Sequence, residues 1–259
     1  FAALLLLPLL MMTLKEFFAR HPKAALGFSG GTDSAYLLYA GLEYGAELRP
    51  YYIKTQFQPE FELEDALRLC SELGVELHVI ELDILSVPGI AENPKDRCYH
   101  CKRALFMLLR ERAASDGYAE LLDGTNASDE PGDRPGTRAL RELGVLSPLR
   151  DCGITKAEVR RRSREAGLFT HDKPSYACLA TRIPAGRRIE PGDLRDIESA
   201  EAALRALGYS DLRVRLTERG ARLELPESQI ECAAFQRAAI LDILGGFGEV
   251  TLDLRGRKE

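Results

Sequence analysis

The chain has 259 residues, enough for one large domain or two small ones with a sizeable core. Hydrophobic residues make up 45% and charged residues 29%, which excludes a wholly disordered, collagen-like or coiled-coil protein. The net charge of -5 argues against a protein that grips nucleic acid over a broad basic surface, although it leaves room for a local basic pocket.

The first eleven residues, which precede Met12, are almost wholly apolar. They lack the basic start and the small-residue cleavage site of a signal peptide, and they are too short to span a bilayer. We interpret them as an upstream extension without a part in the fold. The six cysteines are too sparse for a disulfide framework, and no other segment is long and apolar enough to cross a membrane, so we expect a reduced, cytoplasmic protein.

Short apolar runs alternate with helical periodicity through the first two thirds of the chain. This alternation indicates βαβ units with right-handed crossovers, and therefore an α/β fold with a doubly wound, mainly parallel sheet. Residues 127–136 and 171–191 are rich in turn-forming residues and are predicted to be irregular. The pattern predicts strands at 24–28, 48–53, 77–82 and 119–123, and helices at 34–44, 60–73, 102–115 and from the capping box at 155–158.

The pattern changes after Pro191. We place a domain boundary near Glu190, so that residues 12–190 form the larger domain and residues 191–259 form a smaller α+β domain. In the smaller domain the sequence predicts helices at 193–207 and 226–244, and strands at 212–216, 222–225 and 249–254.

A Ser-Gly-Gly-Thr-Asp-Ser string at residues 29–34 follows the first predicted strand and opens a helix. Glycines allow close backbone approach, and free N–H groups at a helix N-terminus attract anions. Asp33 can hold a Mg²⁺ ion that bridges phosphates. The simpler interpretation is a turn in which Ser34 caps the helix, but the complete string in a strand–loop–helix context favours a phosphate-binding loop. The predicted nucleotide-binding residues of this loop are Ser29, Gly30, Gly31, Asp33 and Ser34.

A second segment, Gly124, Thr125 and Asn126, follows the predicted strand at 119–123. Ligands of α/β proteins bind at the carboxyl ends of parallel strands, so these residues are further candidates for nucleotide binding. A simple turn capped by Asn126 fits the segment equally well. The 29–34 string closes without the Lys-Ser/Thr of a Walker loop and resembles the loop of PP-loop ATP pyrophosphatases. That resemblance implies cleavage of ATP to AMP and pyrophosphate, with adenylylation of a carbonyl oxygen.

Cys98 and Cys101 form a C-x-x-C pair just before a helix. Such a pair can be a redox couple, two metal ligands or two small core residues, and no second C-x-x-C is present to complete a zinc site. Cys178 lies in a loop flanked by Pro and Arg, although a buried packing role is the simpler interpretation of a single cysteine. Three thiolates without a fourth suggest a 4Fe-4S cluster with one open iron. We assign Cys70 and Cys232 to packing.

Several motifs together occur in the order seen in LarE-type sulfur transferases, and the chain resembles this family from about Met12 to its end. The resemblance implies adenylylation of a carboxylate of pyridinium-3,5-biscarboxylic acid mononucleotide with ATP and Mg²⁺, followed by conversion to a thiocarboxylate. The product would serve the nickel-pincer nucleotide cofactor of lactate racemase. The motifs are residues 29–34, 96–102, 122–126, 147–149, 155–158, 172–184, 213–215 and 250–254.

The family has two ways of supplying sulfur. Some members give up the sulfur of one cysteine, which becomes dehydroalanine, and others carry sulfide on the open iron of a 4Fe-4S cluster held by three cysteines. Cys178 falls at the sacrificial position, but the sacrificial type lacks the C-x-x-C pair that this sequence has. We therefore favour a cluster on Cys98, Cys101 and Cys178, which with Asp33 are the predicted catalytic residues. Sacrifice of Cys178 is the alternative.

The resemblance also suggests residues for the substrate. Arg213 and Arg215 share one strand face and are expected to bind the substrate phosphate, while Arg182 suits an anionic ligand. Glu201 matches a family position that binds metal. Without the resemblance, an exposed strand face and an exposed helix carboxylate are the simpler interpretations. The family further implies a hexamer, a separate sulfur donor system, and a substrate-binding or oligomerisation role for residues 191–259.

Three other functions remain as hypotheses. A tRNA-thiolating PP-loop enzyme can share the loop and the three cysteines, but the acidic charge balance and the lack of zinc modules count against an RNA substrate. A PP-loop amidotransferase would have an attached glutaminase domain. A non-catalytic nucleotide-binding or cluster-carrier protein would bind ATP without releasing pyrophosphate.

Overall fold

The computed structural model describes residues 12–129 and 135–257. The predictions for the first eleven residues and for positions 130–134 of the irregular segment lie outside the described residues. The chain packs into two units. Unit 1 holds the described residues of 12–53, 64–80 and 105–173, and unit 2 holds those of 54–63, 81–104 and 174–257. The boundary near Glu190 is a different division of the chain and stays a prediction.

A four-stranded sheet with the strand order β3-β2-β1-β4 forms the centre of unit 1. β1 pairs in parallel with β2 on one side and with β4 on the other, as the βαβ pattern predicted. A parallel bridge from Leu122 to Leu146 adds one further residue beside β4. The strands are β1 (Lys23–Gly27), β2 (Glu47–Lys54), β3 (His78–Glu81) and β4 (Leu121–Leu122).

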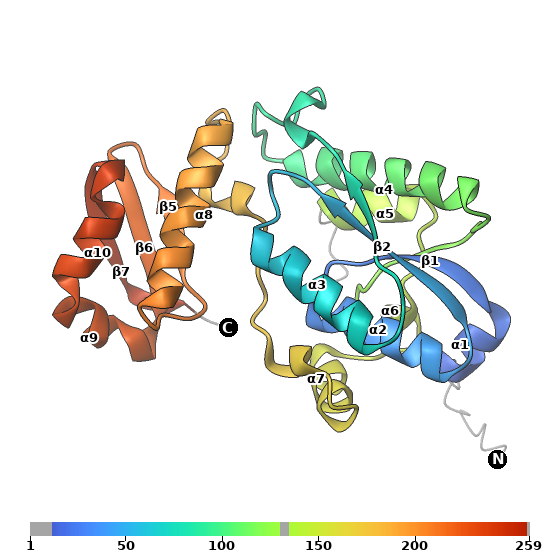
Figure 1. Ribbon diagram of the computed structural model, residues 1–259. Coiled ribbons are helices and arrows are strands. Elements are labelled where there is room, and N and C mark those ends of the chain that lie inside the picture. Colours follow the sequence, from blue (N-terminus) through green and yellow to red (C-terminus); the bar gives the residue numbers. More distant parts are fainter. Residues whose placement is uncertain (1–11, 130–134, 258–259) are drawn as a thin grey trace, which may run out of the picture. The chain divides into compact units, whose positions relative to one another are not determined.

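Helices cover both faces of this sheet (Figure 1). Successive strand residues point to opposite faces, and Ala25 and Tyr51 pack against Leu109 and Leu140 from the helices of one face. On the other face a Cβ atom on Gly41 would lie 2.2 Å from the side chain of Leu48, so that helix packs directly on the strand. The first face carries α4 (Arg97–Ser115) and α5 (Pro135–Glu142), and the second carries α1 (Leu14–Arg20), α2 (Thr32–Glu43) and α3 (Glu60–Glu72).

The strand order places a topological switch point beside β1. The chain runs from β1 to β2 and β3 on one side, and α4 then returns it to β4 on the other side. The carboxyl ends of β1 and β4 therefore flank the position at which open α/β sheets bind ligands. The segments that follow these two strands are the two predicted nucleotide-binding segments. The remaining elements of unit 1 are α6 (Pro148–Asp151), α7 (Lys156–Glu165) and η2 (Phe169–Asp172).

Unit 2 contains a second sheet with the order β5-β6-β7. β5 and β6 are antiparallel, while β6 and β7 are parallel. Leu204 and Leu244 from two helices pack on Val214 and Leu223 of the sheet, which makes the C-terminal region α+β as predicted. The elements are η1 (Ile84–Ser86), η3 (Leu179–Arg182), α8 (Pro191–Ala206), β5 (Arg213–Leu216), β6 (Gly220–Pro226), α9 (Glu227–Phe235), α10 (Arg237–Leu244), η4 (Gly245–Phe247) and β7 (Glu249–Arg257).

Several details of the sequence prediction are wrong. The helix expected at 102–115 begins at Arg97, so Cys98 and Cys101 lie within α4 and not before it. The single helix expected at 226–244 is two helices, because Gln236 leaves helical geometry with ψ of 20° and separates α9 from α10. Helix α5 begins at Pro135, inside a stretch expected to be irregular, and proline suits the first turn of a helix. Cys70 is buried as expected, but Cys232 is exposed and does not pack in the core. Within the described part of the chain, no helix has both the length and the apolar character needed to cross a bilayer.

Candidate active site

The loop after β1 is built to present backbone N–H groups. Gly30 has φ of 68°, a left-handed conformation that glycine adopts without strain, and it turns the chain into α2. Gly31 is the N-cap of α2, so the first N–H groups of that helix have no carbonyl partner within it. The hydroxyl oxygens of Ser29 and Ser34 lie 3.2 Å apart and brace the loop. The loop therefore has the local structure of an anion-binding site.

Asp33 lies in the first turn of α2 and is partly buried. Lys156 Nζ is 2.8 Å from one of its oxygens, and the Asn126 amide is 3.4 Å from the other. Burial raises the pKa of Asp33, and the hydrogen bond and charge of Lys156 oppose that rise. Lys156 was not predicted as a site residue. Its signal in the sequence is a cation at the first position of α7, where the helix dipole favours an acidic residue.

The segment after β4 lies directly against this loop. A Cβ atom on Gly124 would be 2.9 Å from the backbone nitrogen of Ser34, so only glycine allows this approach. The hydroxyl groups of Thr125 and Ser147 both donate to the buried carboxylate of Asp123. The structure thus brings all eight predicted nucleotide-binding residues together. Their binding of nucleotide stays a prediction.

Two further cations surround the loop in unit 1. Lys173 Nζ lies 3.4 Å from the carbonyl oxygen of Gly30 and 2.6 Å from Asp65. Arg160 donates to the carbonyl oxygens of His171 and Lys173, at 3.2 and 3.1 Å, and so fixes this three-residue segment beside α2. Together with Lys156, these side chains concentrate positive charge where a pyrophosphate would need it.

The three predicted cysteines all belong to unit 2. Cys98 and Cys101 lie in the first turns of α4, and Cys178 is the N-cap of η3. Burial, together with the neighbouring Cys178 and Cys98, raises the pKa of Cys101 to about 12. Burial also raises the pKa of Cys178, where Cys98 adds to the effect. The structure therefore brings the three sulfurs near enough for their charges to interact.

The three cysteine side chains are of the chemical type that binds an iron–sulfur cluster. Cysteine thiolates are the ligands of 4Fe-4S clusters, and three of them leave one iron open. Over residues 12–129 and 135–257, however, no three His, Cys, Asp or Glu side chains stand in an arrangement ready to hold a metal ion. The thiol set thus fits a cluster in its chemistry, and the cluster itself stays a prediction.

Arg182 and Glu201 form an ion pair with fully buried side chains. Arg182 Nε and Nη2 lie 2.9 and 3.1 Å from the two carboxylate oxygens, and Tyr176 and the Val214 N–H also donate to Glu201. Burial by itself would raise the pKa of Glu201, but the hydrogen bond and charge of Arg182 hold it below its usual range. The third nitrogen of Arg182 donates to the carbonyl oxygens of Ala177 and Cys178. This pair therefore holds the Cys178 loop in place.

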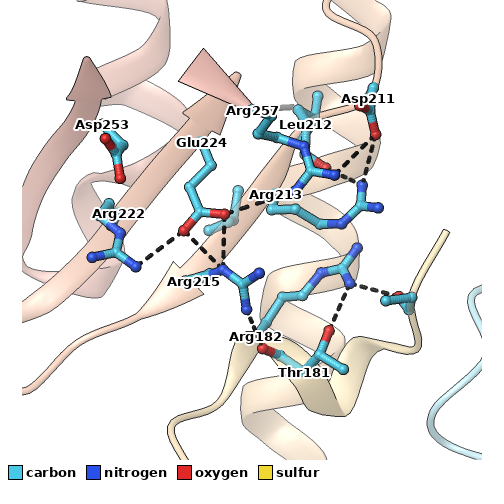
Figure 2. A network of polar contacts seen from close by, with 12 residues as sticks. Thr181, Arg182, Asp211, Leu212, Arg213, Arg215, Arg222, Glu224, Asp253 and Arg257 are labelled. Atoms are coloured by element: carbon cyan, nitrogen blue, oxygen red, sulfur yellow. Dashed lines mark hydrogen bonds and ion pairs between the residues drawn. The ribbon is translucent and has the colours of Figure 1, made fainter. Parts of the chain in front are cut away.

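Arg213 and Arg215 both lie on β5, two positions apart, as the predicted shared strand face requires (Figure 2). Arg213 is buried and donates to the carbonyl oxygens of Ser175 and Leu212. Burial, together with the like charges of Arg182 and Arg257, lowers its pKa to about 10. Guanidinium groups gathered in this way attract an anion.

Two arginines that were not predicted complete this cluster. Arg222 on β6 and Arg257 on β7 lie with Arg215 around Glu224, and Arg257 also shares Asp211 with Arg213 (Figure 2). The signal in the sequence is strand alternation, because the register pairs Arg215 with Arg222. A cavity of about 350 Å³ borders the cluster and is lined by Glu224, Leu225, Asp253, Arg255, Gly256 and Arg257.

A parallel sheet with a Ser-Gly-Gly-Thr-Asp-Ser loop at its switch point defines the protein as a PP-loop enzyme. No family model matches the chain. It is 36% identical over 251 residues to an uncharacterized protein of Synechocystis, which covers 94% of this chain and 92% of that protein. It is 32% identical over 238 residues to the pyridinium-3,5-bisthiocarboxylic acid mononucleotide synthase of Lactiplantibacillus plantarum, which covers 90% of this chain and 86% of that enzyme.

The chain belongs to this LarE-type synthase family. A tRNA-specific 2-thiouridylase MnmA of Thermotoga is 27% identical over 199 residues, which covers 58% of this chain and 54% of that enzyme. Both relatives transfer sulfur, and the chain is a sulfur-transferring enzyme of the PP-loop class. Enzymes of this class use ATP with Mg²⁺.

Proposed function

We propose that the protein adenylylates a carboxylate of pyridinium-3,5-biscarboxylic acid mononucleotide and converts it to a thiocarboxylate. The product serves the nickel-pincer nucleotide cofactor of lactate racemase. The similarity to the pyridinium-3,5-bisthiocarboxylic acid mononucleotide synthase of Lactiplantibacillus plantarum supports this substrate. The observation that carries the proposal is the gathering of Cys98, Cys101 and Cys178 within unit 2 of a chain whose unit 1 has an ATP loop.

The first step makes the carboxyl carbon reactive. A carboxylate oxygen of the substrate attacks the α-phosphorus of ATP, the bond from that phosphorus to the bridging oxygen breaks, and pyrophosphate leaves. The N–H groups at the start of α2 and the hydroxyls of Ser29 and Ser34 bind the departing phosphates. Lys156 and Lys173 add positive charge, and Asp33 holds Mg²⁺. Gly124, Thr125 and Asn126 line the same nucleotide site.

The second step replaces AMP with sulfur. A sulfur nucleophile attacks the acyl carbon of the adenylate, the bond from carbon to the phosphate oxygen breaks, and AMP leaves with a thiocarboxylate formed. A 4Fe-4S cluster held by Cys98, Cys101 and Cys178 would supply sulfide from its open iron. The alternative is attack by the Cys178 thiolate. In that case a thioester forms, and loss of the cysteine Cα proton breaks the Cβ–S bond, which releases the thiocarboxylate and leaves dehydroalanine at position 178. The C-x-x-C pair favours the cluster.

Arg213 and Arg215 bind the phosphate of the mononucleotide in this proposal. The lowered pKa of Arg213 supports it, because positive charge gathered without full compensation is what a phosphate relieves. Arg182 holds the Cys178 loop, and Arg213 and Arg215 donate hydrogen bonds to carbonyl oxygens of that same loop. The full set of hydrogen bonds on Glu201 favours a role in holding Arg182 over a role in binding metal. A hexamer, a sulfur donor system and a cytoplasmic location complete the proposal by family resemblance.

The deciding experiment is anaerobic purification with iron and sulfide measured per chain, for the wild type and for Cys98→Ala, Cys101→Ala and Cys178→Ala. We expect iron in the wild type and its loss in each variant. A wild type without iron that yields product, and whose Cys178 loses the mass of H₂S, would establish the sacrificial alternative. Pyrophosphate release with the pyridinium substrate tests the enzyme itself, because a nucleotide-binding carrier would release none.

A further inference from the structure

Arg97, the first residue of α4, is a buried cation next to the cysteines, with only 7% of its surface exposed. Its Nη1 atom donates to Asn93 Oδ1 at 2.5 Å and to the carbonyl oxygen of Ala180 at 3.0 Å. Its Nη2 atom lies 3.9 Å from the Cys98 sulfur. Among the residues that the structure describes, no carboxylate lies at ion-pair distance from this guanidinium. Because a buried charge without a counter-charge is costly, an anion is expected nearby.

Asn93 supports Arg97 from one turn earlier in the chain. It is almost fully buried, and it has φ of 55°, which is uncommon for a residue other than glycine. Its side-chain amide donates to the carbonyl oxygens of Ile183 and Pro184, at 3.3 and 2.8 Å. Its own carbonyl oxygen accepts from the Gly186 N–H. Asn93 and Arg97 therefore join the C-x-x-C segment to the segment that follows Cys178 through three side-chain hydrogen bonds to backbone carbonyl oxygens.

The hydrogen bonds of Arg97 place its charge beside both segments that carry the predicted cysteines. Its Nη2 atom faces the sulfur of Cys98 in α4, and its Nη1 atom donates to Ala180, two residues after Cys178. Arg97 is thus a buried cation in contact with both segments.

We propose that Arg97 is a positioning residue, which holds the start of α4 and the Cys178 loop in one arrangement and places a buried positive charge beside their sulfurs. The planar guanidinium suits this task, because it donates to two acceptors at once and stays charged when buried. The inference rests on the proposed function only in taking these cysteines as the sulfur-handling group. The arrangement itself is a property of the protein without bound iron.

The test compares Arg97→Met with Arg110→Met, a matched control at an exposed arginine of the same helix. The iron-free proteins are treated with dibromobimane, which bridges two nearby thiols, and the Cys101–Cys178 linkage is quantified by peptide mass spectrometry. Loss of a charged hydrogen-bond donor should reduce the linkage roughly tenfold in Arg97→Met. It should leave the linkage unchanged in Arg110→Met. The iron bound after anaerobic reconstitution should likewise fall in Arg97→Met and stay at the wild-type level in Arg110→Met.

Linkage and iron content at the wild-type level in Arg97→Met would overturn the proposal. Circular dichroism shows whether each variant is folded. If Arg97→Met is unfolded, Arg97→Lys decides, because it keeps the charge and loses the forked donors: reduced linkage in the folded variant supports the proposal, and wild-type linkage overturns it. A wild type that binds no iron, together with reduced linkage in Arg97→Met, would reject the proposed cluster and retain the role of Arg97.

Discussion

The nucleotide loop of unit 1 and the cysteine region of unit 2 are assembled in different ways. The loop is one run of six residues, and the end of β1 and the start of α2 set most of its geometry. The cysteine region joins the start of α4, the loop around Cys178 and the sheet residues Arg213 and Arg215. A contiguous motif carries its own geometry in the backbone, whereas a site made from distant segments needs other residues to hold it together.

The cations of the two regions also differ, in how exposed they are and in which groups they contact. Around the nucleotide loop, Lys156 and Lys173 have partly exposed side chains whose amino groups pair with Asp33 and Asp65, so a phosphate can compete for them. In the cysteine region, Arg97 and Arg182 are buried and donate to backbone carbonyl oxygens. The comparison indicates that the two lysines are available to a ligand, whereas Arg97 and Arg182 hold the framework of the cysteine region.

The largest expected effect is on sulfur transfer by Cys178→Ala. Removal of this thiol should reduce thiocarboxylate formation by about 10⁴-fold, because a residue of the sulfur-carrying set is lost. Pyrophosphate release should persist, since the nucleotide loop is unchanged. Mass spectrometry of the product and a coupled pyrophosphate assay measure the two steps. Cys232→Ala, at an exposed cysteine, is the control. Normal thiocarboxylate yield from Cys178→Ala would remove this residue from the mechanism.

The next effect is on the nucleotide loop. Asp33→Asn keeps the shape of the side chain and removes its charge, so Mg²⁺ binding and the contact with Lys156 are both weakened. We expect pyrophosphate release to fall about 10³-fold, as for other losses of transition-state charge stabilisation. Asp172→Asn, at a side chain that is 72% exposed, should retain full activity. Equal rates in the two variants would contradict a role for Asp33 in the first step.

The third effect is on stability. Glu201→Gln leaves the buried guanidinium of Arg182 without its counter-charge, and should lower the free energy of unfolding by about 3 kcal/mol. Urea unfolding measures the change. Glu190→Gln, at an exposed carboxylate, should alter it by less than about 0.5 kcal/mol. A stable Glu201→Gln protein would show that the pair does not hold the framework, and would reopen a direct role for Glu201 in ligand binding.

The smallest effect is the pH dependence of that same pair. The pKa of Glu201 is lowered in the folded protein, so its contribution to stability is present above its unfolded pKa and is lost as the pH falls through the folded pKa. The difference in unfolding free energy between wild type and Glu201→Gln should therefore shrink on acidification, by at most about 1.4 kcal/mol per pH unit. Urea titrations at stepped pH test this. A difference that grows on acidification would mean that the pair does not stabilise the ionised carboxylate.

The sequence alone gave a good account of unit 1. The strand–helix alternation correctly predicted the parallel sheet, and the 29–34 string and residues 124–126 were each correctly expected to follow a strand. That these two strands are neighbours is shown by the structure. These features depend on periodicity and on glycine conformations, which are local. The break at Gln236 and the exposure of Cys232 were missed, because packing against other elements decides them.

The sequence by itself determined the class of fold and the position of the glycine-rich loop, and it singled out Cys98, Cys101 and Cys178 as a set, since motif and spacing encode each of these. Only the tertiary structure decided which charges accompany them. Lys156 meets Asp33 across 123 positions of the chain, and Arg97 meets Ala180 across 83. Arg222 and Arg257 join the arginines of β5 through the register of a sheet. Periodicity in one sequence can place a residue on a face of its own element, but it does not say which distant residue it meets, because that depends on how whole elements pack.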